Sequence, residues 1–166
     1  MLLPVYMRDG HHHIIFIKRT ENVTEHKGQI SFPGGSREAL DVSLLDTALR
    51  ESHEEIGLDA GDVEVLGELD DEVTTTSNFV VTPFVGILPW PYRFIRNEIE
   101  VEEIIDVPIP ALLAQGCLRP DTEELNGETV ASFTYQYEGR RIWGATARIL
   151  NKFLEIYVRA IDETGG

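Results

Sequence analysis

The chain has 166 residues, of which 42% are hydrophobic, and this size predicts a single domain over residues 1–166 with a substantial core. The formal net charge of −15 argues against a nucleic-acid partner, because such proteins present a basic face, and favours a site that attracts divalent cations. No stretch approaches the roughly 20 apolar residues of a membrane span. Cys117 is the only cysteine, which is compatible with a reducing compartment, so we expect a cytoplasmic protein without a membrane partner.

Several strands are predicted in the first half of the chain. Asp9-Gly10 is a strong hairpin signal between two apolar runs. The stretch 70–78, rich in acids and threonines, is predicted to be a loop. The expected strands cover residues 5–7, 12–18, 29–32, 63–69 and 79–88.

A helix is predicted over residues 44–56. Ser43 and Asp46 form a capping-box pattern with Asp in place of Glu, and Gly57 is expected to end the helix in the left-handed conformation. Four residues at helical spacing predict the face that packs on a core. They are Leu45, Leu49, Ser52 and Ile56.

The second half predicts a loop ending near residue 100 and then alternating elements. The expected strands are 102–107, 118–125 and 129–137, the last two joined at Asn126-Gly127. A short helix over 108–114 begins with proline. Trp143, Ala147, Leu150, Leu154 and Tyr157 have the spacing of a closing amphipathic helix. Strands interspersed with two long helices indicate the α/β class.

Glu51, Glu54 and Glu55 lie close together on the predicted helix. At about 100° per residue they spread over roughly a third of its circumference. Like-charge neighbours cost about 0.2–0.5 kcal/mol per pair, and the helix dipole disfavours anions near its C-terminal end. A hard divalent cation such as Mg²⁺ or Mn²⁺ reverses this balance. A solvated acidic face is the alternative, and helix geometry alone does not choose between them.

The segment 50–58 reads Arg-Glu-Ser-His-Glu-Glu-Ile-Gly-Leu and resembles the second half of the Nudix box. Ser52 stands where that box has an aliphatic residue. The first half is one residue longer than the common spacing, because Gly35 lies fifteen residues before Arg50. The expected acidic residue of the first half therefore falls near Asp41 or Val42.

Further segments resemble the coenzyme A pyrophosphatase subgroup of Nudix hydrolases, which also tends to carry the longer box. The subgroup leader usually has an Arg four residues before Gly28, where this chain has Thr24. The resemblance covers nearly the whole chain. It rests on residues 15–20, 26–35, 67–71, 81–84 and 142–148.

The resemblance implies a Nudix fold, with a mixed sheet between helices, and hydrolysis of coenzyme A or acyl-CoA to 3′,5′-ADP and (acyl) 4′-phosphopantetheine. It places Mg²⁺ or Mn²⁺ on Glu51 and Glu55, with Glu54 as a further ligand or a base. We expect Arg50 both to orient these glutamates and to balance their charge. Glu100 resembles a loop acid that reaches the site, although a solvated acidic run explains it equally well.

Substrate contacts are predicted from position. Gly34 and Gly35 would let the backbone approach a metal or phosphate, or would form a plain turn. Arg19, Lys27 and Arg37 are the phosphate candidates. Trp143 and Phe84 are expected in the core and not as nucleobase platforms. The expected partner is a small nucleotide, and a homodimer is left open.

Three alternatives remain from the sequence. Thr24 motivates an ADP-ribose, dinucleotide or nucleotide-sugar pyrophosphatase, which would use the same chemistry. A non-catalytic nucleotide-binding module shares the fold, but the complete glutamate set argues against it. An isoprenoid diphosphate isomerase is disfavoured because no cysteine lies near the box.

Overall fold

The computed structural model describes residues 1–21, 27–74, 79–125 and 127–164. The chain begins with the predicted hairpin of β1 (Leu2–Arg8) and β2 (His11–Arg19). Asp9 and Gly10 form its turn with φ values of 52° and 80°, the left-handed geometry that suits a tight hairpin. Both strands are longer than predicted, since β1 also includes residues 2–4 and Arg8, and β2 also includes His11 and Arg19.

The main sheet has six strands among the described residues, in the order β3-β2-β1-β7-β4, with β8 on the other side of β2. β1 runs parallel to β7 and the remaining pairs are antiparallel, so the sheet is mixed. The strands that join the hairpin are β3 (Ile30–Ser31), β4 (Glu64–Glu68), β7 (Phe84–Ile87) and β8 (Val101–Pro108).

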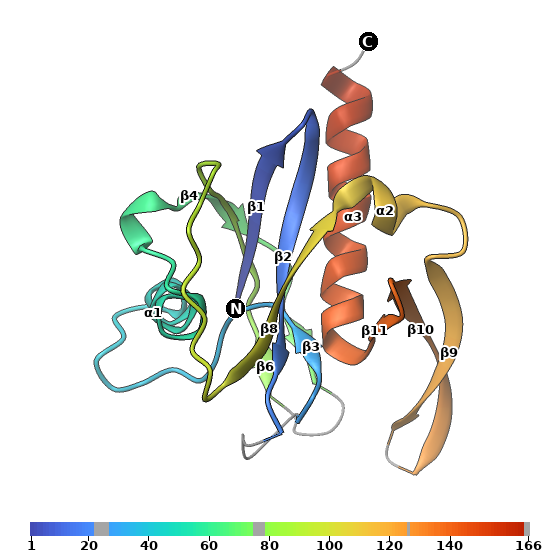
Figure 1. Ribbon diagram of the computed structural model, residues 1–166. Coiled ribbons are helices and arrows are strands. Elements are labelled where there is room, and N and C mark those ends of the chain that lie inside the picture. The colour runs from blue at the N-terminus through green and yellow to red at the C-terminus, as the bar shows by residue number, and fades with distance from the viewer. Residues whose placement is uncertain (22–26, 75–78, 126, 165–166) are drawn as a thin grey trace.

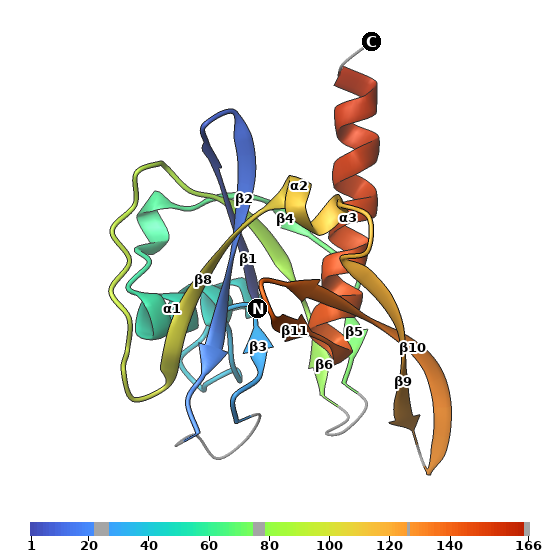
Figure 2. The ribbon, with the colours of Figure 1, turned by 45° about the vertical axis from the view of Figure 1, so that its right-hand side comes forward.

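Two long helices cover opposite sides of this sheet, α1 (Leu44–Ile56) and α3 (Gly144–Thr164), as Figures 1 and 2 show. Alternation along β1 explains the two layers, because Leu2 packs in the cluster with α1 whereas Leu3 packs in the cluster with α3. The expected arrangement of a mixed sheet between helices is therefore confirmed. No helix in the described part of the chain is both long and apolar enough to cross a membrane.

Helix α1 has the predicted bounds and caps. The Ser43 side chain accepts from the Asp46 amide, the Asp46 carboxylate accepts from the Ser43 amide, and Gly57 has φ 67°. Ser52 is fully buried, and its hydroxyl is satisfied by donating to the Ala48 carbonyl at 2.7 Å. The predicted packing face was incomplete, because Glu55 is also buried.

The predicted loop 70–78 and strand 79–88 need correction. Residues Glu72–Val73 form β5 and pair with β6 (Val80–Val81), so the first segment contains a strand. The second segment is two strands, interrupted at Thr82 and Pro83. Proline has no amide hydrogen to continue a ladder, which explains the break. A short 3₁₀ helix, η1 (Ala60–Asp62), was not predicted.

The remaining elements are α2 (Ile109–Leu113), β9 (Leu118–Leu125), β10 (Glu128–Tyr137) and β11 (Arg140–Ile142). The predicted β9–β10 hairpin is confirmed, although Asn126 of its turn lies outside the described residues. β11 is an additional strand that follows the turn at Glu138 and Gly139. Phe84 is buried as expected, and Trp143 is half-buried beneath the Arg141 guanidinium.

Candidate active site

The three glutamates of α1 lie in three different environments. The side chain of Glu54 is 50% exposed, that of Glu51 is 16% exposed and that of Glu55 is 1% exposed. The carboxylates on this part of the helix therefore range from half exposed at Glu54 to fully buried at Glu55.

Glu55 is held by groups from the two segments that precede the helix. The Gly34 amide donates to Oε2 at 2.9 Å, and Arg19 Nη1 at the end of β2 donates to Oε1 at 3.2 Å. Burial raises the pKa of Glu55 to about 7, although the Gly34 amide and Arg19 oppose this increase. Gly34 has φ 151°, a conformation that favours glycine, and this residue brings its backbone amide to the Glu55 carboxylate.

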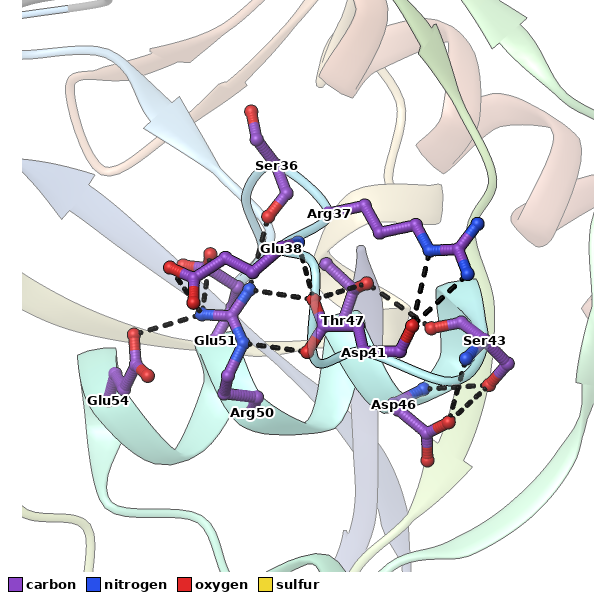
Figure 3. Close-up of polar contacts among 10 residues, drawn as sticks. All are labelled: Ser36, Arg37, Glu38, Asp41, Ser43, Asp46, Thr47, Arg50, Glu51 and Glu54. Carbon is purple, nitrogen blue, oxygen red and sulfur yellow. Dashed lines mark hydrogen bonds and ion pairs between the residues drawn. The ribbon is translucent and has the colours of Figure 1, made fainter.

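Arg50 lies at the centre of a second set of contacts, shown in Figure 3. Its Nε and Nη2 donate to the two oxygens of Asp41 at 3.0 and 3.1 Å, a two-pronged pair. Its Nη1 lies 3.0 Å from Glu51 Oε1 and 3.2 Å from Glu54 Oε2. These contacts place one guanidinium among three carboxylates, the arrangement that both predicted roles of Arg50 require.

Asp41, and not Val42, occupies the acidic position in the first half of the box. Asp41 is buried and also accepts from the Glu38 amide at 2.8 Å and the Thr47 hydroxyl at 2.9 Å, whereas Val42 is 86% exposed. The hydrogen bonds from Arg50, first of all, hold the pKa of Asp41 well below its ordinary value. Our candidate residues omitted Asp41, although Arg50 needs a carboxylate partner and the spacing pointed to this position.

Glu100 reaches the same region from the loop before β8. The Asn97 amide of that loop donates to the Glu55 carbonyl at 3.0 Å, and the charge of Glu100 contributes to raising the pKa of both Glu51 and Glu55. Gly35 lies against the Glu51 carboxylate, since a Cβ added to this glycine would be 2.5 Å from the Glu51 carboxyl carbon. The structure therefore brings Glu51, Glu55, Glu100 and Gly35 together.

The three cationic residues predicted to contact phosphate differ in their position relative to the acidic site. Arg19 is at the site, and its buried Nε has no hydrogen-bond partner among the described residues. Arg37 donates to the carbonyls of Asp41 and Val42, and Figure 3 shows its guanidinium on the far side of Asp41 from Glu54. Lys27 is exposed in the turn before β3, and Thr24 lies outside the described residues.

The donor set has the chemistry that Mg²⁺ and Mn²⁺ require, because it offers carboxylate oxygens of graded exposure. Among the described residues, no three His, Cys, Asp or Glu side chains converge closely enough to hold a metal ion as they stand. Arg50 Nη1 lies within hydrogen-bond distance of both Glu51 and Glu54 and supplies positive charge there. A bound cation would take over this charge compensation, so the chemistry of these carboxylates is compatible with a divalent metal.

A mixed sheet between two helices, with a carboxylate-bearing helix entered through a glycine-containing loop, defines an α/β protein with an acidic candidate site. The NUDIX domain model matches residues 3–135, and the chain belongs to the Nudix family. It is a Nudix pyrophosphohydrolase, an enzyme that cleaves a phosphoanhydride bond.

Two bacterial relatives cover most of the chain. The Nudix hydrolase NudL of Citrobacter koseri is 34% identical over 160 residues, covering 96% of this chain and 82% of its own. NudL of Yersinia enterocolitica is 33% identical over 155 residues, covering 93% and 78%. The crystal structure of a MutT/nudix family protein from Enterococcus faecalis shares the fold, with a TM-score of 0.59 at 15% identity, covering 97% of this chain and 60% of that chain.

Proposed function

We propose that this enzyme hydrolyses the diphosphate of coenzyme A or its thioesters to 3′,5′-ADP and 4′-phosphopantetheine or its acyl form. The observation that carries the proposal is the buried Glu55 carboxylate, which is held by Gly34 and Arg19 beside Glu51 and Glu100. Gly34 is the second-last residue of the leader segment 26–35, which resembles the coenzyme A pyrophosphatase subgroup. That leader thus contributes directly to the acidic centre.

Nudix hydrolases use divalent ions, and here Glu51, Glu54 and Glu55 would hold Mg²⁺ or Mn²⁺. When bound, the ion neutralises diphosphate oxygens and lowers the pKa of water. Glu54 is the most exposed of the three, which supports a role either as a further metal ligand or as the base that accepts a proton from the attacking water. Water attacks one phosphorus in line with the bridging oxygen, which leaves with the other phosphate.

Arg19 is the proposed phosphate contact in this scheme. A buried donor without a partner is costly, and the Nε of Arg19 is such a donor among the described residues. An anionic phosphate oxygen would satisfy it. Lys27 is exposed and remains a candidate phosphate contact, whereas Arg37 donates to the Asp41 and Val42 carbonyls of its own loop.

The test is direct product analysis. Purified protein is incubated with coenzyme A and Mg²⁺ or Mn²⁺, and products are identified by liquid chromatography with mass spectrometry. We expect 3′,5′-ADP and 4′-phosphopantetheine in equal amounts, with no turnover after chelation. Carrying out the reaction in ¹⁸O-labelled water identifies which phosphorus is attacked. If neither metal supports release of 3′,5′-ADP, the substrate proposal is wrong.

A substrate panel separates this proposal from the alternatives of the same chemistry. The values of kcat/KM for coenzyme A, an acyl-CoA, ADP-ribose, a dinucleoside polyphosphate and a nucleotide sugar are compared under one metal condition. We expect coenzyme A or the acyl-CoA to rank first. A higher value for ADP-ribose would assign the enzyme to that substrate class, and metal-dependent binding without cleavage of any compound would indicate a binding module.

A further inference from the structure

The loop that carries Glu100 is hydrogen-bonded to the C-terminal end of α1. Residues 89–100 pass beside α1 before the chain enters β8 (Figures 1 and 2). The amide of Ile95 donates to the Ile56 carbonyl at 2.9 Å, and that of Asn97 donates to the Glu55 carbonyl at 3.0 Å. The last turn of a helix has carbonyls without helical partners, and this loop satisfies two of them.

Thr20 fastens the same loop from the opposite side. Its hydroxyl donates to the Ile99 carbonyl at 2.7 Å, and its amide donates to the Glu100 carbonyl at 2.9 Å. Thr20 is only 8% exposed, so these bonds are shielded from water. One residue therefore holds two consecutive carbonyls, the second of which belongs to the loop acid itself.

Asn97 closes the turn that leads to Glu100. Its side-chain oxygen accepts from the Ile99 amide at 3.1 Å, and its carbonyl accepts from the amides of Glu100 at 3.2 Å and Val101 at 2.8 Å. The backbone of Glu100 is thus tied through its amide to the turn and through its carbonyl to Thr20. Little freedom remains for this backbone unless one of these bonds breaks.

We propose that Thr20 is a positioning residue for hydrolysis, and that its buried hydroxyl fixes the loop acid Glu100 against the Glu51–Glu55 pair. Thr20 directly follows Arg19, whose guanidinium holds Glu55. One dipeptide at the end of β2 therefore sets the position of an acid on α1 and of an acid on the loop. Displacements near 1 Å can reduce turnover by roughly 100-fold, so such fastening has kinetic value. The inference rests on the proposed function, because it assumes that Glu100 acts in turnover.

The first test compares Thr20→Val with Thr20→Ser. Valine keeps the branched shape and the backbone amide but removes the hydroxyl, whereas serine keeps the hydroxyl. We expect Thr20→Val to lower kcat roughly ten-fold with KM changed less than about two-fold, and Thr20→Ser to retain kcat within about two-fold. Equal kcat values in the two variants would overturn the proposal.

A double-mutant cycle with Glu100→Gln shows whether Thr20 acts through Glu100. If it does, the effect of Thr20→Val on kcat disappears in the Glu100→Gln background. Effects that simply multiply would overturn the proposal. A Glu100→Gln variant with wild-type turnover would also overturn it, and would remove Glu100 from the proposed mechanism while leaving the substrate assignment intact.

Amide hydrogen exchange supplies a readout that does not need turnover, and it applies even if coenzyme A is not the substrate. We expect the amides of Glu100 and Val101 to exchange faster in Thr20→Val than in wild type or Thr20→Ser, while β9 and β10 remain unchanged. Unchanged protection of these two amides would contradict the proposal. If Thr20→Val does not fold, Thr20→Ala, which also removes the hydroxyl, replaces it in the comparison with Thr20→Ser.

Discussion

The glutamates of α1 differ in the group that neutralises each of them. Arg50 contacts Glu51 and Glu54, whereas Arg19 and the Gly34 amide hold Glu55. Glu54 is half exposed, and Arg50 keeps its contacts with Asp41 and Glu51 without it, so removing the Glu54 charge should affect chemistry more than folding.

Glu54→Gln tests this separation. We expect kcat to fall on the order of 100-fold or more, because a neutral amide neither binds a hard cation well nor accepts a proton. The melting temperature without metal should stay the same or rise slightly, since repulsion with Glu51 is relieved. Glu64→Gln, an exposed substitution on β4, is the matched control for steady-state kinetics and thermal melting. A destabilised variant with normal turnover would show that Glu54 is structural.

Asp41→Asn tests the buried partner of Arg50 through pH. The pKa of Asp41 is lowered in the folded protein by Arg50, below its ordinary value of 3.8, so its contribution to stability is present above that value and is lost as pH falls. We expect the variant to unfold at lower urea concentration at pH 6. The difference between the urea midpoints of variant and wild type should become smaller as the pH falls below roughly 4. A difference in urea midpoint that does not change with pH would show that the charge of Asp41 does not contribute to the stability of the fold.

Among the secondary-structure elements, one arginine links three that are distant in sequence. Arg148 on α3 lies 2.6 Å from Glu72 of β5 and 2.8 Å from Glu123 of β9, and both carboxylates are mostly buried. Lys152, one turn further along α3, also contacts Glu72 at 2.9 Å. This ion network attaches the two small sheets to the helix.

We expect Arg148→Met to destabilise the protein by about 3 kcal/mol, because two shielded carboxylates lose their main counter-ion. Urea unfolding at pH 7 measures this loss. Arg159→Met on the exposed part of α3 is the control and should change stability by less than about 0.5 kcal/mol. An equal effect of the two substitutions would mean that the network contributes no specific stability.

The whole molecule carries a net charge of −15, and the electrostatic repulsion between its carboxylates is greatest where acidic residues cluster. A cation that binds only the folded state raises stability by about 2.7 kcal/mol at 100 times its dissociation constant. We therefore expect Mg²⁺ or Mn²⁺ to raise the melting temperature more than NaCl of equal ionic strength does.

The variant Glu51→Gln/Glu55→Gln should lose the metal-specific part of this shift and keep the salt effect. Differential scanning fluorimetry measures both, and isothermal calorimetry should detect uptake by wild type alone. A metal-specific shift that survives in the double variant would place the ion elsewhere.

Much of the fold was predictable because its signals are local. The Asp9-Gly10 hairpin, the capping box at Ser43 and the end of α1 at Gly57 each depend on residues within a few positions. The short strands β5 and β11 were missed because two or three residues cannot display a period of two. The break at Pro83 was missed because the apolar run continues across it.

The sequence by itself determined the family resemblance, the helix and the spacing of its three acids, since periodicity and capping act between near neighbours. Only the tertiary structure decided that Asp41 and not Val42 pairs with Arg50, that Glu55 is buried while Glu54 is exposed, and that Thr20 fastens the loop of Glu100. Burial and partner choice depend on which distant segments pack together, and the contacts of Thr20 span about 80 residues of chain. For this reason the residue types of the site could be predicted from the sequence, whereas their arrangement in space depended on tertiary packing.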